Sequence, residues 1–135
     1  MHEQITLTIC GTILSQMPEA LAIYRFGTWG TENERKESDI DLAILLPQPI
    51  KSLTLWTLSQ DLARQINKEV DLIDLRQAST VMRMQIVAHG KRLFCANEYE
   101  CERFEDYVFS SYIRFNEERR EILEDIKQRG SIYGG

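Results

Sequence analysis

The sequence has little of what builds disulfide-rich or membrane-spanning proteins. Among its 135 residues there are three prolines and three cysteines, and Cys10, Cys95 and Cys101 have no regular spacing. We therefore expect neither a disulfide framework nor a zinc site, but reduced thiols packed as small hydrophobic side chains. No run of about 18 apolar residues occurs, so no membrane-spanning helix is expected. Residues 1–4 lack the basic start and apolar stretch of a secretory signal, which favours a cytoplasmic protein.

Positive charge is scarce as well. The 16 Lys and Arg residues are outnumbered by 21 Asp and Glu residues, and the net charge of −5 argues against direct nucleic-acid binding. Apolar residues make up 43% of the chain and charged residues 27%, which is typical of a globular protein able to bury a core. We expect residues 1–135 to form one domain, with its core at about 20–95 and a C-terminal helix at about 98–128.

Hydrophobic periodicity predicts alternating helices and strands. The N-terminal spacing fits a short helix ended by Pro18, although part of that segment would also fit a strand. Ser52 and either Ser79 or Thr80 are the expected caps of two later helices, and Gly90 ends the second. Strands are expected at 21–26, 39–46, 70–75 and 91–95, helices at about 53–68, 80–88 and 98–128, and a frayed tail at 130–135. This order predicts an α/β (α+β) fold, with a mixed sheet of about four strands packed with helices.

Two aspartates open the second predicted strand. Asp39 and Asp41 are two residues apart, so on a strand their side chains share one face, with Cα atoms roughly 6.5–7 Å apart. Such carboxylates repel each other, and a divalent cation such as Mg²⁺ between them relieves the repulsion. Alone, the pair could simply solvate the start of the strand. Asp71 on the next strand can supply a third carboxylate to the same face, whereas Asp74 has the opposite parity.

A glycine and a hydroxyl residue end the first strand. Gly27 permits close approach to the backbone, and Thr28 offers a hydroxyl and an N–H to phosphate oxygens. The pair could equally be a turn with an N-cap. Trp29, the next residue, could stack on a base or lie against the sheet.

The joint spacing of these residues resembles that of nucleotidyltransferases related to DNA polymerase β, and specifically of minimal nucleotidyltransferase (MNT) antitoxins of HEPN/MNT toxin–antitoxin pairs. The family signature is Gly-Ser, about ten residues, then Asp-x-Asp. It stands here as Gly27-Thr28, followed ten residues later by Asp39-Ile40-Asp41. The similarity continues through 70–75 and 86–94, and the size and long C-terminal helix also match.

The resemblance implies a polymerase β-like nucleotidyltransferase fold and a reaction that moves AMP from ATP to a hydroxyl, releasing pyrophosphate. Asp39 and Asp41 would share two Mg²⁺ ions. Asp71 would hold the metal at the attacking hydroxyl and help to remove its proton. These three aspartates are the implied catalytic and metal-binding residues.

The family pattern also implies which residues bind the triphosphate. Gly27 and Thr28 would hold the β- and γ-phosphates, and Arg35 and Lys36 in the same loop would neutralise their charge. The loop departs from the pattern at four positions, while the metal-binding carboxylates are intact. The four departures are Thr28 in place of serine, Gly30 in place of a small residue that is often alanine, Thr31 in place of arginine and Glu32 in place of glycine.

For biological role, the resemblance implies an antitoxin that transfers AMP to a HEPN ribonuclease toxin, on a tyrosine hydroxyl, within a hetero-oligomer. A second hypothesis is a non-catalytic antitoxin that occludes its toxin through the aromatic C-terminal helix. A third is a transferase acting on a small molecule or RNA, which the short chain disfavours because no second domain is available to shape an acceptor pocket.

Overall fold

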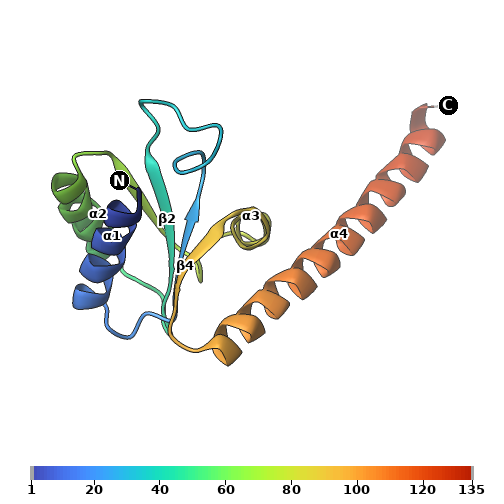
Figure 1. Cartoon of the computed structure of the whole chain (residues 1–135). Helices are drawn as coiled ribbons and strands as arrows, with labels where there is room; N and C mark the ends of the chain where they lie inside the picture. The colour runs from blue at the N-terminus through green and yellow to red at the C-terminus, as the bar shows by residue number, and fades with distance from the viewer. Residues whose placement is uncertain (1, 135) are drawn as a thin grey trace.

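A mixed four-stranded sheet carries helices on both faces (Figure 1). The computed structural model describes the backbone of residues 2–134 and the side chains of residues 2–129. The elements follow in the order α1 (His2–Gln16), β1 (Ala22–Phe26), β2 (Ile40–Leu45), α2 (Ser52–Ile66), β3 (Val70–Asp74), α3 (Thr80–His89), β4 (Lys91–Cys95) and α4 (Glu98–Gly134).

The strand order is β3-β2-β1-β4. β1 is antiparallel to β2 and to β4, whereas β2 and β3 are parallel. A parallel pair requires a crossover connection, which α2 supplies. The predicted mixed sheet is therefore confirmed, and β2, the strand that follows Asp39, lies in its interior.

β2 is buried on both faces of the sheet. Ile40, Leu42 and Ile44 belong to the core beneath α1 and α2. Ala43 and Leu45 belong to a second core, which α3 and the start of α4 cover. Because side chains alternate along a strand, Asp41 shares the face of Ala43 and Leu45. The candidate carboxylates therefore lie on the α3 side of the sheet.

Each predicted helix and strand is present, with two differences. Ser52 is not the cap of α2: Lys51 takes the N-cap position in extended backbone without a side-chain cap bond, and Ser52 is the first helical residue. α4 continues to Gly134, beyond the predicted end at about Gln128, so the expected tail is helical. Its last turns are rich in strong helix formers, and the interior glycine, Gly130, costs only about 1 kcal/mol, while Gly134 is the final residue of the helix. Gly135 lies outside the described residues.

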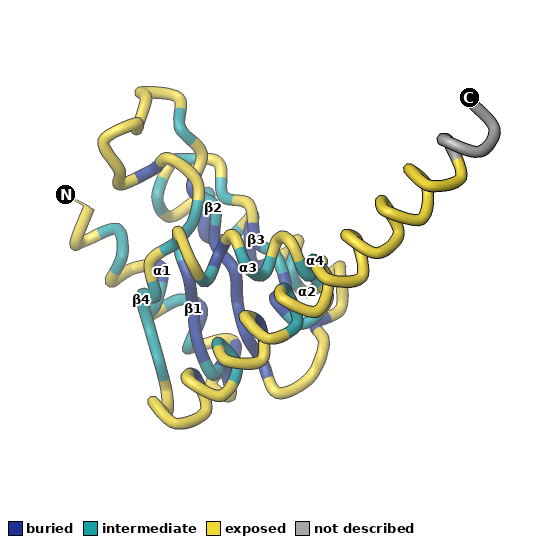
Figure 2. Tube along the Cα trace, turned by 90° about the vertical axis from the view of Figure 1, so that its right-hand side faces the viewer, coloured by how far each residue is buried: buried dark blue, intermediate teal, exposed yellow. Residues whose placement is uncertain are grey.

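α4 leaves the body of the protein after its first turns and extends away from the sheet (Figure 1). Figure 2 shows that most of this extension is exposed. The exposed helix still carries large apolar side chains, at Ile113, Phe115, Ile122, Leu123 and Ile126. Over residues 2–134, no helix combines the length and apolar character needed to cross a membrane.

Trp29 lies in the core, which settles the alternatives left open by its sequence position. Its side chain is fully buried in the cluster beneath α1. The His2 ring lies 5.0 Å from the indole, and the Arg25 guanidinium carbon lies 5.9 Å from the ring centroid. Trp29 therefore anchors the loop between β1 and β2 to the body of the protein.

We predict that Trp29→Ala lowers the free energy of unfolding by about 3–5 kcal/mol, because truncating a fully buried Trp removes apolar burial and leaves a cavity. The matched control is Trp56→Ala on α2, where the side chain is 61% exposed and the change should stay within about 0.5 kcal/mol. Urea unfolding of both variants measures the difference. Equal destabilisation would contradict the anchoring role of Trp29.

Candidate functional site

The parallel pairing of β2 and β3 places two of the predicted carboxylates side by side. Asp41 and Asp71 are register partners across this pair, so their side chains emerge on the same face. Asp39 directly precedes β2 and is exposed, as is Asp71, whereas Asp41 is half-buried. The three aspartates singled out from the sequence therefore gather at one end of the sheet.

Their charges act on one another. The pKa of Asp41 is raised, first by burial and then by the negative charges of Asp71 and Asp39. A carboxylate whose ionised form is disfavoured in this way gains most from a bound cation. The electrostatics of the folded chain thus identify Asp41 as the centre of the cluster.

Gly27 lies directly against Asp41. Phe26 is the register partner of Asp41, and Gly27 follows with φ +75°, a conformation that favours glycine. A Cβ built on Gly27 would clash with Oδ2 of Asp41. The turn after β1 can therefore approach the carboxylate only because this residue has no side chain.

Hydrogen bonds close the loop between β1 and β2. The hydroxyls of Thr28 and Ser38 lie 3.1 Å apart, and the backbone N–H of Arg35 donates to Ser38 Oγ at 2.7 Å. Lys68 Nζ donates to the Ser38 carbonyl at 3.4 Å. This arrangement joins Thr28 to the residue immediately before Asp39. An open hollow of about 580 Å³ lies beside Thr28 and Arg35.

Ser38 and Lys68 were not singled out from the sequence as site residues. The position of Ser38 before the Asp-x-Asp pair was visible, but its hydrogen bond to a loop residue follows only from the fold. Lys68, just past the end of α2, approaches the loop because the α2 crossover returns the chain to the start of β3. It contributes a positive charge next to the backbone of Ser38, the residue before Asp39, and acts on the loop carboxylate Glu34.

Other candidate groups lie away from the cluster. Arg25 packs over Trp29, and Gly30, with φ +79°, leaves the space that Arg25 occupies. This explains why Gly30 stands where the family often has alanine. Asp74 is buried and accepts hydrogen bonds from the backbone N–H groups of Ile50, at 2.8 Å, and Arg76, at 3.0 Å. Asp74 therefore has a structural role, fixing the loop after β2.

The carboxylates of Asp39, Asp41 and Asp71 fit a hard divalent cation, because carboxylate oxygens are the ligands that Mg²⁺ prefers. The raised pKa of Asp41 also means that its ionised form is unfavourable without a cation. As the side chains of residues 2–129 stand, no three His, Cys, Asp or Glu groups surround a single point in a metal-binding arrangement. Binding an ion would thus require side-chain rotation, which the exposed Asp39 and Asp71 are free to make.

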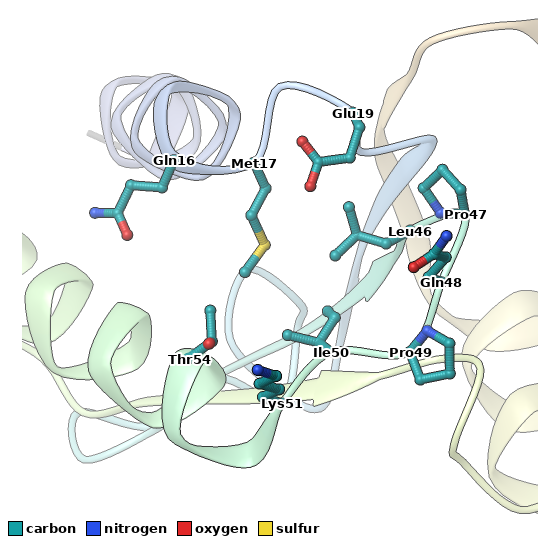
Figure 3. A pocket seen from close by; sticks show the side chains of 10 residues that line it. All are labelled: Gln16, Met17, Glu19, Leu46, Pro47, Gln48, Pro49, Ile50, Lys51 and Thr54. Carbon is teal, nitrogen blue, oxygen red and sulfur yellow. The ribbon is translucent and has the colours of Figure 1, made fainter.

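A separate hollow of about 460 Å³ lies at the opposite end of β2 (Figure 3). Its floor includes the core side chains Met17, Leu46 and Ile50, and Glu19 and Lys51 are at its edge. None of the predicted site residues lines it. It is therefore distinct from the carboxylate cluster.

The polymerase β nucleotidyltransferase model ("Polymerase beta, Nucleotidyltransferase") matches residues 10–99, which include the turn at Gly27 and all three aspartates. The chain belongs to this nucleotidyltransferase family. Its expected enzyme class and its polymerase β-like fold are thereby confirmed.

Among nucleotidyltransferases, the chain is 36% identical to the protein adenylyltransferase MntA of Shewanella oneidensis over 110 residues, which is 82% of this chain and 78% of that relative. A solved structure of tri-AMPylated Shewanella oneidensis HEPN toxin in complex with MNT antitoxin matches with a TM-score of 0.80 and 32% identity, covering 93% of this chain and 98% of that one. A toxin–antitoxin structure with AMP-PNP matches with a TM-score of 0.81 and 33% identity, covering 90% and 97%. The resemblance to MNT antitoxins is confirmed.

Gly27→Ala should reduce nucleotidyl transfer at least tenfold, because the new methyl group would displace the Asp41 carboxylate and strain the left-handed turn. The control is Gly11→Ala in α1, where a Cβ meets nothing within 4 Å. That change should retain activity and add about 0.5–1 kcal/mol of stability. Initial rates and thermal unfolding measure the two effects. Full activity in Gly27→Ala would show that the close approach is not required.

The raised pKa of Asp41 predicts a pH-dependent gain in stability for Asp41→Asn without divalent cations. Below about pH 3.9, the pKa of an Asp side chain in an unfolded chain, the Asp41 carboxyl is protonated in both the folded and the unfolded protein. As the pH rises through the higher pKa that Asp41 has in the folded protein, the wild type loses stability. Asp41→Asn should therefore be more stable than the wild type at pH 7, with the difference vanishing in acid. Denaturation with EDTA present measures this, with the exposed Asp106→Asn as control. A destabilised Asp41→Asn at pH 7 would refute the electrostatic assignment.

Proposed function

We propose that this chain is an antitoxin that transfers AMP from ATP to a tyrosine hydroxyl of a cognate HEPN ribonuclease toxin and thereby neutralises it. The observation that carries the proposal is the β2–β3 register, which sets Asp41 beside Asp71 with Gly27 against the Asp41 carboxylate. The similarity to MntA, named a protein adenylyltransferase, and to a complex containing AMPylated toxin supports it.

In the proposed reaction, the toxin hydroxyl oxygen attacks the α-phosphorus of ATP and the bond to the bridging oxygen breaks, so that pyrophosphate leaves. Asp39 and Asp41 would hold Mg²⁺, and Asp71, beside Asp41, would orient the acceptor hydroxyl and help to remove its proton. When bound, two Mg²⁺ ions would supply charge stabilisation at the attacking and leaving oxygens. The proximity of the carboxylates accounts for the charge that such ions would neutralise.

The loop after β1 would bind the triphosphate. Gly27 allows a phosphate to approach the backbone, and the hydroxyl of Thr28 is placed by its contact with Ser38. Arg35 and Lys36 are both exposed in this loop, where they can neutralise the β- and γ-phosphates. Anchoring of the loop by the buried Trp29 limits the ordering that ATP binding would require.

The exposed part of α4 would contact the toxin. Its apolar side chains continue the helical spacing of residues buried against the body: Phe104 and Val108 are followed by Phe115, Ile122 and Ile126. A helix face of this kind is typical of a protein–protein interface. It also favours the second candidate function, in which binding alone occludes the toxin. A ribonuclease partner is consistent with a cytoplasmic location for the pair.

The decisive experiment incubates the purified chain with Mg²⁺, ATP and the HEPN toxin encoded beside it, and follows the intact mass of the toxin. We expect one or more added AMP units, none when EDTA is present, and a rate at least ~100-fold lower for Asp39→Asn and Asp41→Asn. Asp61→Asn on α2, on the other side of the sheet, is the matched control and should retain the wild-type rate.

Toxin activity on RNA, measured with and without ATP, separates the two functions. If the Asp39→Asn and Asp41→Asn variants bind the toxin in gel filtration but leave it active, neutralisation requires transfer. If they neutralise the toxin without ATP, occlusion is the mechanism and the catalytic proposal is wrong.

A further inference from the structure

Two thiols meet where α4 joins the sheet. Cys95 is the last residue of β4, Cys101 lies in the first turn of α4, and their sulfur atoms are 2.7 Å apart. A disulfide bond is about 2.05 Å long, so the sulfurs need to move by less than 1 Å to be joined. Both cysteines are free thiols in this structure.

Backbone hydrogen bonds fix the short connection between them. The N–H of Ala96 donates to the Leu21 carbonyl at 2.9 Å, and the N–H of Cys101 donates to the Asn97 carbonyl at 3.0 Å. The Cys101 thiol also contacts the Leu21 carbonyl, at 3.5 Å. The sulfurs therefore face each other within a corner of the chain that backbone hydrogen bonds keep ordered.

The two thiols differ in accessibility. Cys101 is fully buried beside Tyr24, whereas Cys95 is half-buried and can be reached from solvent. The pKa of Cys101 is raised to about 12, by burial first and then by its contact with Cys95. Cys95 is thus placed to react first, and Cys101 to react with it from within the protein.

We propose that Cys95 and Cys101 form a redox-active pair, which closes to an intramolecular disulfide when a small-molecule disulfide such as oxidised glutathione is available. This inference goes beyond the proposed transferase function and does not depend on it. The site lies where α4 emerges from the sheet.

The reaction is two thiol–disulfide exchanges. The Cys95 thiolate attacks one sulfur of oxidised glutathione, which forms a mixed disulfide and releases one glutathione thiolate. Cys101 then loses its proton and attacks the Cys95 sulfur, which releases the second glutathione. The protein dithiol is oxidised by two electrons, and one oxidised glutathione is reduced to two thiols.

The disulfide would fasten α4 to β4 covalently at a junction where polar contacts add to the apolar packing of Cys101 and Phe104. Tyr24 donates to Glu105 at 2.8 Å, and Arg92 pairs with Glu98 at 2.9 Å and with Glu105 at 3.4 Å. Arg92 and Glu98 lie at the protein surface, where an ion pair contributes little. A covalent bond at this junction restricts any pivoting of α4, the helix that carries the exposed apolar face.

The test equilibrates the full chain in glutathione buffers of increasing oxidised fraction, stops the exchange with acid, blocks the free thiols of the unfolded chain with N-ethylmaleimide in denaturant and determines the intact mass. We expect three labels per chain in reducing buffer and one, on Cys10, in oxidising buffer, with the peptides containing Cys95 and Cys101 joined. The oxidised chain should also melt about 5 °C higher, because the bond constrains the unfolded state.

Cys10→Ser is the matched control, because Cys10 lies on α1 beneath the other face of the sheet; it should still lose two labels on oxidation. Cys95→Ser, which removes the thiol that attacks oxidised glutathione, should keep both remaining labels, form no glutathione adduct and show no rise in Tm on oxidation. Labelling of Cys95 and Cys101 at every glutathione ratio, a stable adduct on wild-type Cys95, or a disulfide between two chains would each overturn the proposal.

Discussion

The site depends on the sheet, which keeps two negatively charged carboxylates close together although they repel each other. Asp41 and Asp71 lie side by side because β2 and β3 are paired in parallel register. The backbone positions of the two residues cannot separate, because Ile40, Leu42 and Leu72 on the same strands are buried in the opposite face. Moving the strands apart would require the core to unpack, at about 1.5–3 kcal/mol for each large apolar side chain exposed. The fold thus maintains a local excess of negative charge. This charge contributes to the raised pKa of Asp41, and a bound cation would neutralise it.

The same strand performs two tasks through the alternation of its side chains. On one face β2 contributes Ile40, Leu42 and Ile44 to the core, and on the other it begins with Asp41 and continues with Ala43 and Leu45. Substitutions on the first face therefore act through stability, and substitutions at the start of the second face act through charge. Gly27 connects this strand to the phosphate-binding loop, because the turn can approach Asp41 only without a side chain. The loop, in turn, is positioned by the burial of Trp29 together with the hydrogen bonds of Thr28, Arg35 and Ser38.

Hydrophobic periodicity predicted the helices and strands from β1 onward, because each of these segments has an apolar face or a buried run, whereas the spacing in α1 fitted a helix and, in part, a strand. The Asp-x-Asp spacing likewise predicted a shared face. What the sequence could not supply were contacts between distant segments. The burial of Trp29 depends on α1 covering the sheet, the contact of Ser38 with Thr28 depends on loop closure, and the meeting of Cys95 with Cys101 depends on the angle at which α4 leaves β4. Ser52 failed as a cap because the chain turns one residue earlier, at Lys51, before the helix begins.

The long helix α4 shows how one periodic pattern can serve two environments. Its apolar positions keep the same spacing from Phe104 and Val108, which pack on the body, to Ile122 and Ile126, which are exposed. An isolated helix derives little stability from propensity alone, and apolar side chains left in water add none. The exposed half is therefore suited to burial against another surface, whereas the contacts of Tyr24, Arg92 and the two cysteines are confined to the base of the helix. The contacts at the base of α4 therefore determine how rigidly the helix is attached to the sheet. Through that attachment they also determine how firmly the carboxylate cluster is positioned relative to a surface that binds the far end of the helix.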